Sequence, residues 1–346
     1  MDTINNPPSR IESAIPSVRR WLKLVALLIF AIVILGGATR LTKSGLSITE
    51  WDPIFGIIPP LNLVAWQAVF EKYKLSSQYR LMNQGMSLAE FQFIYAWEWA
   101  HRLFARMIGV VFLVPLIFFG LTRRLENRMW PRLVLLFIIG GLQGALGWYM
   151  VSSGLIDRVE VSQYRLAAHL TLAAALFAAV IWTISCLNNR HSWPRDVDGW
   201  TAIILCSLVL LQIAAGGFVA GLNAGQGYNT WPLMDGKFIP DGLIVAQPLW
   251  KNFFETALTV QFDHRILAYS IFLIAIWHAL KTFSVTSMVL AYLVFAQACL
   301  GIFTLLMHVP MGAALVHQAT AMLVLAAAVW NMHKKTIKPL LVQDLQ

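Results

Sequence analysis

Long apolar runs separated by polar stretches of very unequal length dominate the pattern of this chain. Each run is about twenty residues long, enough for a helix rising ~1.5 Å per residue to cross the hydrocarbon core of a bilayer. The connections at 38–98 and 221–263 are long, and the connections that alternate with them are short. The pattern predicts eight transmembrane helices, at 21–37, 103–121, 133–150, 166–187, 201–220, 266–280, 288–307 and 312–331.

Composition agrees with an all-α integral membrane protein rather than a soluble domain. Hydrophobic residues make up 58% of the 346 residues and charged residues 12%, and the mean hydropathy is +0.65. The net charge of +9 comes from basic residues that cluster beside the apolar runs, so it indicates membrane orientation and not nucleic-acid binding. The three cysteines show no C-x-x-C spacing, which argues against a zinc site or a disulfide framework.

The distribution of Lys and Arg predicts how the chain lies in the membrane. Basic residues flank the first run, fill the short connection after the second run, and close the chain. The positive-inside rule then places both termini in the cytoplasm and the long connections in the periplasm, if the membrane is a bacterial inner membrane. The first twenty residues lack the pattern of a cleaved signal. We therefore expect cytoplasmic segments at 1–20, 188–200 and 334–346.

Internal similarity predicts that the chain is two copies of a four-helix unit. The pair Gly36-Gly37 ends the first run, and Gly216-Gly217 lies near the end of the fifth. The segment 143–147 (QGALG) likewise matches 297–301 (QACLG). A repeat of four spans keeps its orientation, so the units should be related by a pseudo-two-fold axis along the membrane normal. The predicted halves are 21–187 and 201–333.

Four histidines occupy related places in these halves: His101, His169, His264 and His317 each stand near the start of an even-numbered run. In the predicted topology all four lie near the periplasmic surface. Helices that offer imidazoles in pairs at matching depth can ligate both axial faces of a heme iron. A single histidine at a helix end would more simply rest among the lipid headgroups, but four equivalent ones favour two heme sites. His308 is close enough to His317 to replace it as a ligand.

Charged residues near the histidines differ between the halves. Glu98 stands three residues before His101, on the same helical face, whereas the second half has Gln261 there and its carboxylate at Asp263. A carboxylate near the membrane is costly unless it is paired, so Glu98 is a candidate functional group. The alternative to a functional role is that Glu98 only forms a salt bridge, with Arg102 or Arg40. Four arginines could attract heme propionates or simply anchor the interface: Arg40, Arg102, Arg165 and Arg265.

Three motifs of the chain resemble the heme A synthase family. They are Gly36-Gly37-Ala38-Thr39-Arg40 continuing to Trp51 and Pro59-Pro60, then Glu98-Trp99-Ala100-His101-Arg102, and finally the run from Gly225 to Met234. The resemblance extends from about Trp21 to His333. The first long connection has no cysteine, which is similar to the proteobacterial and mitochondrial branch.

The resemblance implies an oxidoreductase that converts heme O to heme A by successive hydroxylations of a ring methyl, for cytochrome oxidase assembly. It implies a resident heme B on His264 and His317, with Arg265 beside it. Heme O would be held by His101 and His169, with Glu98 as a proton acceptor or orienting group. Heme O synthase would act upstream, an unidentified acceptor would take the electrons, and a homo-oligomer is compatible with the sequence.

Two other functions are compatible with the same residues. A diheme b-type electron-transfer subunit, such as part of a quinone-linked reductase, would use the four histidines without altering either heme. A transporter with two parallel repeats would need polar residues near the middle of its spans, and the chain has few there. A prenyltransferase that makes heme O would need aspartate-rich magnesium sites, and the sequence has no such cluster.

Overall fold

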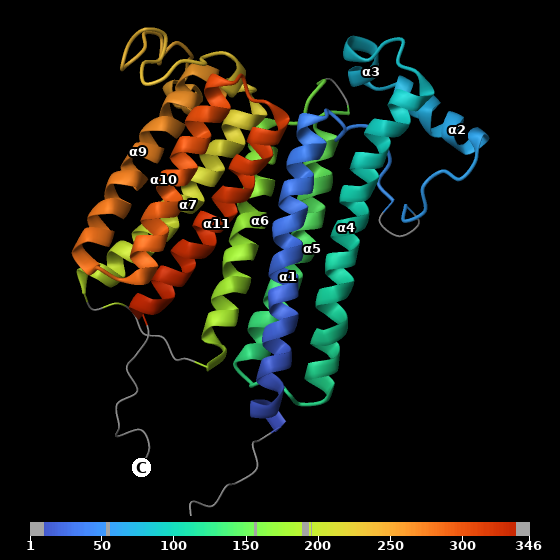
Figure 1. The fold of residues 1–346 in the computed structure, drawn as a ribbon. Helices are drawn as coiled ribbons and strands as arrows, with labels where there is room; N and C mark the ends of the chain where they lie inside the picture. Colours follow the sequence, from blue (N-terminus) through green and yellow to red (C-terminus); the bar gives the residue numbers. More distant parts are fainter. Residues whose placement is uncertain (1–9, 53–55, 156–157, 189–193, 195, 337–346) are drawn as a thin grey trace, which may run out of the picture.

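The computed structural model describes residues 10–52, 56–155, 158–188, 194 and 196–336, and their regular structure is helical (Figure 1). Eight helices are long and apolar enough to cross a membrane, which confirms the predicted number of spans. They are α1 (Arg10–Leu41), α4 (Leu88–Leu121), α5 (Met129–Ser152), α6 (Gln163–Ser185), α7 (Val197–Gly221), α9 (Ala257–Thr282), α10 (Val285–Leu306) and α11 (Met311–Thr336).

Several helices are longer than the apolar runs from which they were predicted. Helix α4 begins at Leu88 because Ser87 caps it: the Ser87 hydroxyl accepts from the Glu90 amide, and the Glu90 carboxylate accepts from the Ser87 amide. Helix α1 begins at Arg10, so residues 10–20 of the expected N-terminal tail are helical. Residues 1–9, 189–193, 195 and 337–346 of the expected cytoplasmic segments lie outside the described residues.

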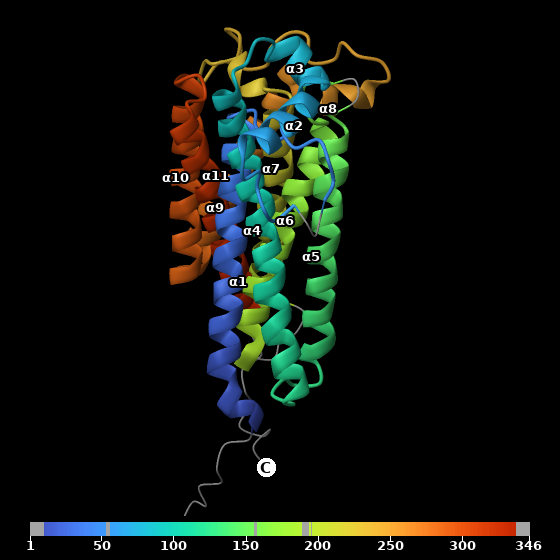
Figure 2. The same ribbon diagram turned by 90° about the vertical axis from the view of Figure 1, so that its right-hand side faces the viewer.

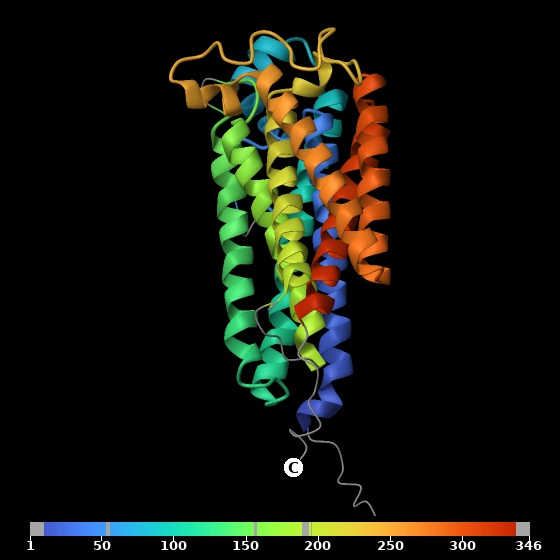
Figure 3. The same ribbon diagram turned by 90° about the vertical axis from the view of Figure 1, so that its left-hand side faces the viewer.

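The long helices pack in two groups. In the first group, α1 and α5 each pack against α4 and α6; in the second, α7 and α10 each pack against α9 and α11. Contacts of α6 with α7 and α11, and of α1 with α11, join the groups. Figures 2 and 3 show α5 and α10 at opposite edges of the molecule. The buried core runs through both groups and includes Leu22, Leu133, Leu205 and Leu325.

Both long connections lie at one end of the helices, here called the loop end. The described chain begins at Arg10 and ends at Thr336 at the other, here called the terminal end (Figure 1). The first connection contains α2 (Leu63–Lys74) and α3 (Ser77–Met82). The second contains α8 (Asn252–Glu255) and two short 3-10 turns, Ala224–Gln226 and Leu249–Lys251. The apolar-run pattern did not predict these short helices. Stacked rings of Phe70, Tyr73 and Phe91 attach α2 to the first turns of α4.

Candidate functional site

The four predicted histidines lie on alternate long helices, and each faces a glycine of a neighbouring helix. The helices are α4 for His101, α6 for His169, α9 for His264 and α11 for His317. A Cβ atom on the facing glycine would come within 2.9–3.3 Å of the imidazole Cε1 in every case, so a larger residue would displace the ring. The facing pairs are Gly36 with His101, Gly147 with His169, Gly216 with His264 and Gly301 with His317.

His101 lies within the range of electrostatic interaction with His169, and His264 within that of His317. Each half therefore brings its two predicted histidines to the same region of the molecule. The Nδ1 atoms of His101, His169 and His317 are buried and have no hydrogen-bond partner. Unpaired buried nitrogens and glycine-lined surroundings fit axial ligands of a planar group.

Three of the four histidines accept a hydrogen bond from a glutamine side chain at their backbone oxygen. The side-chain amide nitrogen of Gln143 donates to the backbone oxygen of His169 at 2.9 Å. Gln212 and Gln297 donate in the same way to His264 and His317, each at 3.0 Å. Sequence inspection had linked Gln143 with Gln297 but missed Gln212, although its spacing to Gly216 repeats that of the other two to their glycines.

Glu98 is buried, and its carboxylate is fully engaged. Its Oε1 pairs with Arg102 Nη2 at 2.6 Å, and its Oε2 accepts from Ser47 Oγ at 2.7 Å and from the Ile48 amide at 2.9 Å. Arg102 also donates to the backbone oxygens of Ile48 and Glu50. The salt bridge considered in the sequence analysis is therefore present, and it fastens the first long connection to α4.

Arg265 makes the matching contacts on α9 without a carboxylate. It donates to the backbone oxygens of Tyr228 and Thr230, each at 2.9 Å, and to Gln261 Oε1 at 3.1 Å. Gln261 in turn donates to the Ala224 oxygen at 2.8 Å. The neutral amide both donates and accepts, whereas Glu98 accepts only.

The other two arginines have partners within the protein. Arg40 Nη2 lies 3.0 Å from both Glu160 Oε2 and Asn223 Oδ1, so it bridges the α5–α6 connection and the end of α7. Arg165 donates to the backbone oxygen of Tyr149 at 2.6 Å, and its guanidinium lies over the Tyr149 ring. The Nε atoms of Arg40 and Arg265 are buried and have no partner, so both could still receive an anionic group.

The remaining histidines do not join these pairs. His308 is exposed at the end of α10, which favours His317 over it as the partner of His264. His278 is completely buried and lies 3.1 Å from Asn331 Nδ2. His333 Nε2 lies 2.9 Å from the Ser185 oxygen. His191 lies outside the described residues.

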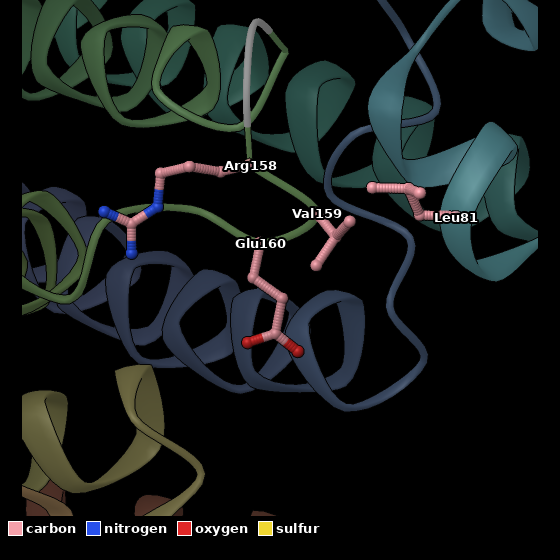
Figure 4. A pocket seen from close by; sticks show the side chains of 4 residues that line it. All are labelled: Leu81, Arg158, Val159 and Glu160. Carbon is pink, nitrogen blue, oxygen red and sulfur yellow. The ribbon is translucent and has the colours of Figure 1, made fainter.

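A surface hollow lies apart from the histidines, between α3 and the α5–α6 connection (Figure 4). Leu81, Arg158, Val159 and Glu160 line it. In the described part of the chain no group of three or more His, Cys, Asp or Glu could hold a bare metal ion.

The chain is similar to known proteins over most of its length. Residues 19–329 match the COX15-CtaA family, described as cytochrome oxidase assembly protein. The chain is 52% identical over 319 residues to the heme A synthase of Parvibaculum lavamentivorans, covering 91% of this chain and 93% of that protein. It is 52% identical over 327 residues to that of Mesorhizobium japonicum (91% and 90%) and 50% identical over 328 residues to that of Allorhizobium ampelinum (91% and 90%).

Proposed function

The chain belongs to the COX15-CtaA family of cytochrome oxidase assembly proteins, and we propose that it is a heme A synthase of the bacterial inner membrane. In this reaction a ring methyl of heme O is oxidised to the formyl group of heme A. The observation that carries the proposal, beside the family match, is the set of four imidazoles, each packed against a glycine of an adjacent helix.

The two groups of helices form tandem four-helix halves related by a pseudo-two-fold axis along the membrane normal. Equivalent hydrogen bonds in the two groups support this proposal. Arg102 donates to the backbone oxygens of Ile48 and Glu50, and Arg265 donates to those of Tyr228 and Thr230. Both termini face the cytoplasm, so both imidazole pairs lie toward the periplasm.

The second half holds a resident heme B on His264 and His317. Gln212 and Gln297 fix the backbone at both histidines, and Arg265 leaves a buried Nε atom near this end of α9. When bound, such a heme supplies one-electron transfer, and four electrons must leave for a methyl group to become an aldehyde. The acceptor that finally takes these electrons is a separate partner.

The first half binds heme O between His101 and His169. Helix α5 supports this assignment, because its buried residues, Met129, Leu133 and Leu136, all lie toward the terminal end. Near Gln143 a Cβ on Gly140, Gly141 or Gly144 would meet no atom within 4 Å. A loosely packed helix suits a bulky substrate that enters and leaves, delivered by heme O synthase, better than a permanent cofactor.

Glu98 acts in this half by orienting the loop over the substrate. Its carboxylate holds Ser47, Ile48 and Arg102 at the start of the long connection. To take a proton from the reacting centre it would have to leave Arg102, an expensive step for a buried carboxylate. Holding α4 in place at Glu98, and with it His101 one turn further on, needs no such step.

The test is to express the full chain with heme O supplied, extract the pigments and separate them chromatographically. Wild type should yield heme A, and His101→Ala and His169→Ala should yield unchanged heme O while keeping the resident heme. His264→Ala and His317→Ala should lose the resident heme. If wild type binds two hemes and leaves heme O unchanged, the protein is an electron-transfer subunit and the proposal is wrong.

A further inference from the structure

Four helices face the imidazoles, and three of them carry a glutamine four residues before the facing glycine. These are Gln143 before Gly147, Gln212 before Gly216 and Gln297 before Gly301. One helical turn separates each amide from its glycine, so both lie on the face turned toward the histidine. The fourth helix, α1, has Ile32 in this place before Gly36.

Two of the three amides contact more than the backbone of the histidines. Gln212 Nε2 lies 3.1 Å from His264 Nδ1 and 3.2 Å from His264 Nε2. Gln297 Nε2 lies 3.3 Å from His317 Nε2. At these two sites the amide nitrogen therefore contacts both the backbone oxygen and the ring of a histidine.

Unpaired atoms show what these amides still need. The Oε1 atoms of Gln143, Gln212 and Gln297 are all buried and have no hydrogen-bond partner. A neutral imidazole that binds iron through one nitrogen carries a proton on the other and needs an acceptor for it. The Nδ1 atoms of His169 and His317 are likewise buried and unpartnered. Gln143 and Gln297, which are bonded to the backbone oxygens of these two histidines, carry the amide oxygens that could accept from them.

His101 lacks such a neighbour. Its Nδ1 is also buried and unpartnered, but the side chain at the equivalent place is the hydrocarbon of Ile32, which cannot accept a hydrogen bond. The half with Gln212 and Gln297 therefore has an amide for both imidazoles. The half with Gln143 has an amide for His169 alone.

We propose that Gln143, Gln212 and Gln297 are positioning residues for iron-bound imidazoles, and that His101, without one, is the ligand that releases the iron. This inference rests on the proposed function, since it takes the His101 side as the substrate site. A hydrogen bond to the distal nitrogen orients an imidazole and makes it a stronger donor to iron. A heme whose two histidine ligands both have such a hydrogen bond is retained. A heme with only one such ligand can be exchanged.

The first experiment measures the resident heme in the purified full-length protein. Gln212→Leu and Gln297→Leu should raise its reduction potential and speed its transfer to apomyoglobin by about tenfold or more, the usual effect of losing an outer-shell partner. Gln212→Glu and Gln297→Glu keep an acceptor of greater strength and should lower the potential. A purely structural role would move the potential in the same direction for both substitutions.

A matched control tests whether any interhelical amide would behave alike. Gln318 also donates to a helix backbone oxygen, that of Val33, at 2.7 Å, but this contact joins α11 to α1 and not to a histidine. Gln318→Leu should therefore leave the potential of the resident heme unchanged. A shift as large as that of Gln297→Leu would overturn the inference.

The second experiment adds the missing amide. Ile32→Gln should increase the heme O that copurifies with the protein by about tenfold and slow the release of product, whereas Ile32→Leu should do neither. Unchanged potentials in the Leu and Glu variants, or unchanged heme O retention in Ile32→Gln, would contradict the inference alone. Wild-type protein that purifies without any heme would instead contradict the proposed function.

Discussion

The Glu98–Arg102 pair of α4 and the Gln261–Arg265 pair of α9 show how two equivalent places can share a shape and differ in charge. Both arginines reach back to the long connection that precedes their own helix and donate to two of its backbone oxygens. Only the first is neutralised by a buried carboxylate. The arginine is thus paired with a carboxylate in one place and held by neutral acceptors alone in the other, and substitutions should affect these two arginine clamps very differently.

The facing glycines give the largest expected effects. Gly147→Leu places a side chain where His169 Cε1 would be 2.9 Å from its Cβ, and Gly301→Leu does the same at His317. Because a ligand itself is displaced, each loss should exceed the roughly 100-fold upper range of outer-shell changes. Gly301→Leu should remove the resident heme seen by absorbance. Gly147→Leu should keep that heme and abolish heme A formation.

A different pattern would contradict the assignment of the halves. If Gly147→Leu removed the resident heme and Gly301→Leu left it in place, the cofactor would belong to the first half. Gly109→Leu on α4 is the matched control, because a Cβ there would meet no atom within 4 Å.

Removing each arginine comes next. Arg102→Leu leaves Glu98 as an uncompensated buried charge and should destabilise the protein by about 3–5 kcal/mol. Arg265→Leu leaves only neutral acceptors unsatisfied and should cost about 1–3 kcal/mol. Thermal unfolding in detergent, with equal heme loading, measures the difference. Equal losses would show that the charge on Glu98 does not distinguish the two clamps.

Glu98→Gln converts the first clamp into the second. The amide oxygen can still accept from Arg102, so this variant should lose less stability than Arg102→Leu, about 1–2 kcal/mol. If Glu98 only orients the loop, heme A formation should fall in proportion to stability. Complete loss of activity in a stable, heme-loaded Glu98→Gln protein would establish that the carboxylate has a direct chemical role.

The repeated elements were the ones open to prediction from the sequence. Apolar length predicts the eight spans, and spacing picks out the four histidines that the structure packs against glycines, because both depend on local pattern. The salt bridge of Arg102 with Glu98 was among the predictions, but the backbone oxygens that Arg102 and Arg265 bind were not predictable, since their place depends on the loop fold. Gln212 was not predicted because the equivalent residue of α1 is Ile32, so comparing the two halves shows no match at this position.

Arg40 tests how firmly the two groups of helices are joined. It reaches from α1 to Glu160 and, across the groups, to Asn223 and the Ala220 oxygen. Its equivalent on α7 is Ala220 itself, so α7 has no matching arginine there. Arg40→Ala should cost about 1–2 kcal/mol, given a partly exposed ion pair with hydrogen bonds. Protease sensitivity of the α5–α6 connection should rise, and a variant at the exposed Arg80 should not show this.

The smallest effect concerns α2 and α3, which have no counterpart in the second long connection. The Tyr73 hydroxyl donates to Gln78 and accepts from Asn83, and Gln78 holds the Lys43 oxygen at the end of α1. Tyr73→Phe should therefore cost about 1 kcal/mol. Burial raises the pKa of the Tyr73 phenol above its ordinary value of 10.0.

The sign of the pH effect follows from that direction. A phenol whose pKa is raised in the folded state contributes stability that is present below pH 10.0 and is lost as the pH rises through the folded value. Hydrogen exchange of the α2–α3 amides, corrected for the intrinsic rate, should therefore accelerate above about pH 10 in wild type and not in Tyr73→Phe. The amides of α8 in the second connection should show no such difference between the two proteins. Identical profiles for α2–α3 would show that the phenol does not hold this segment to the membrane helices.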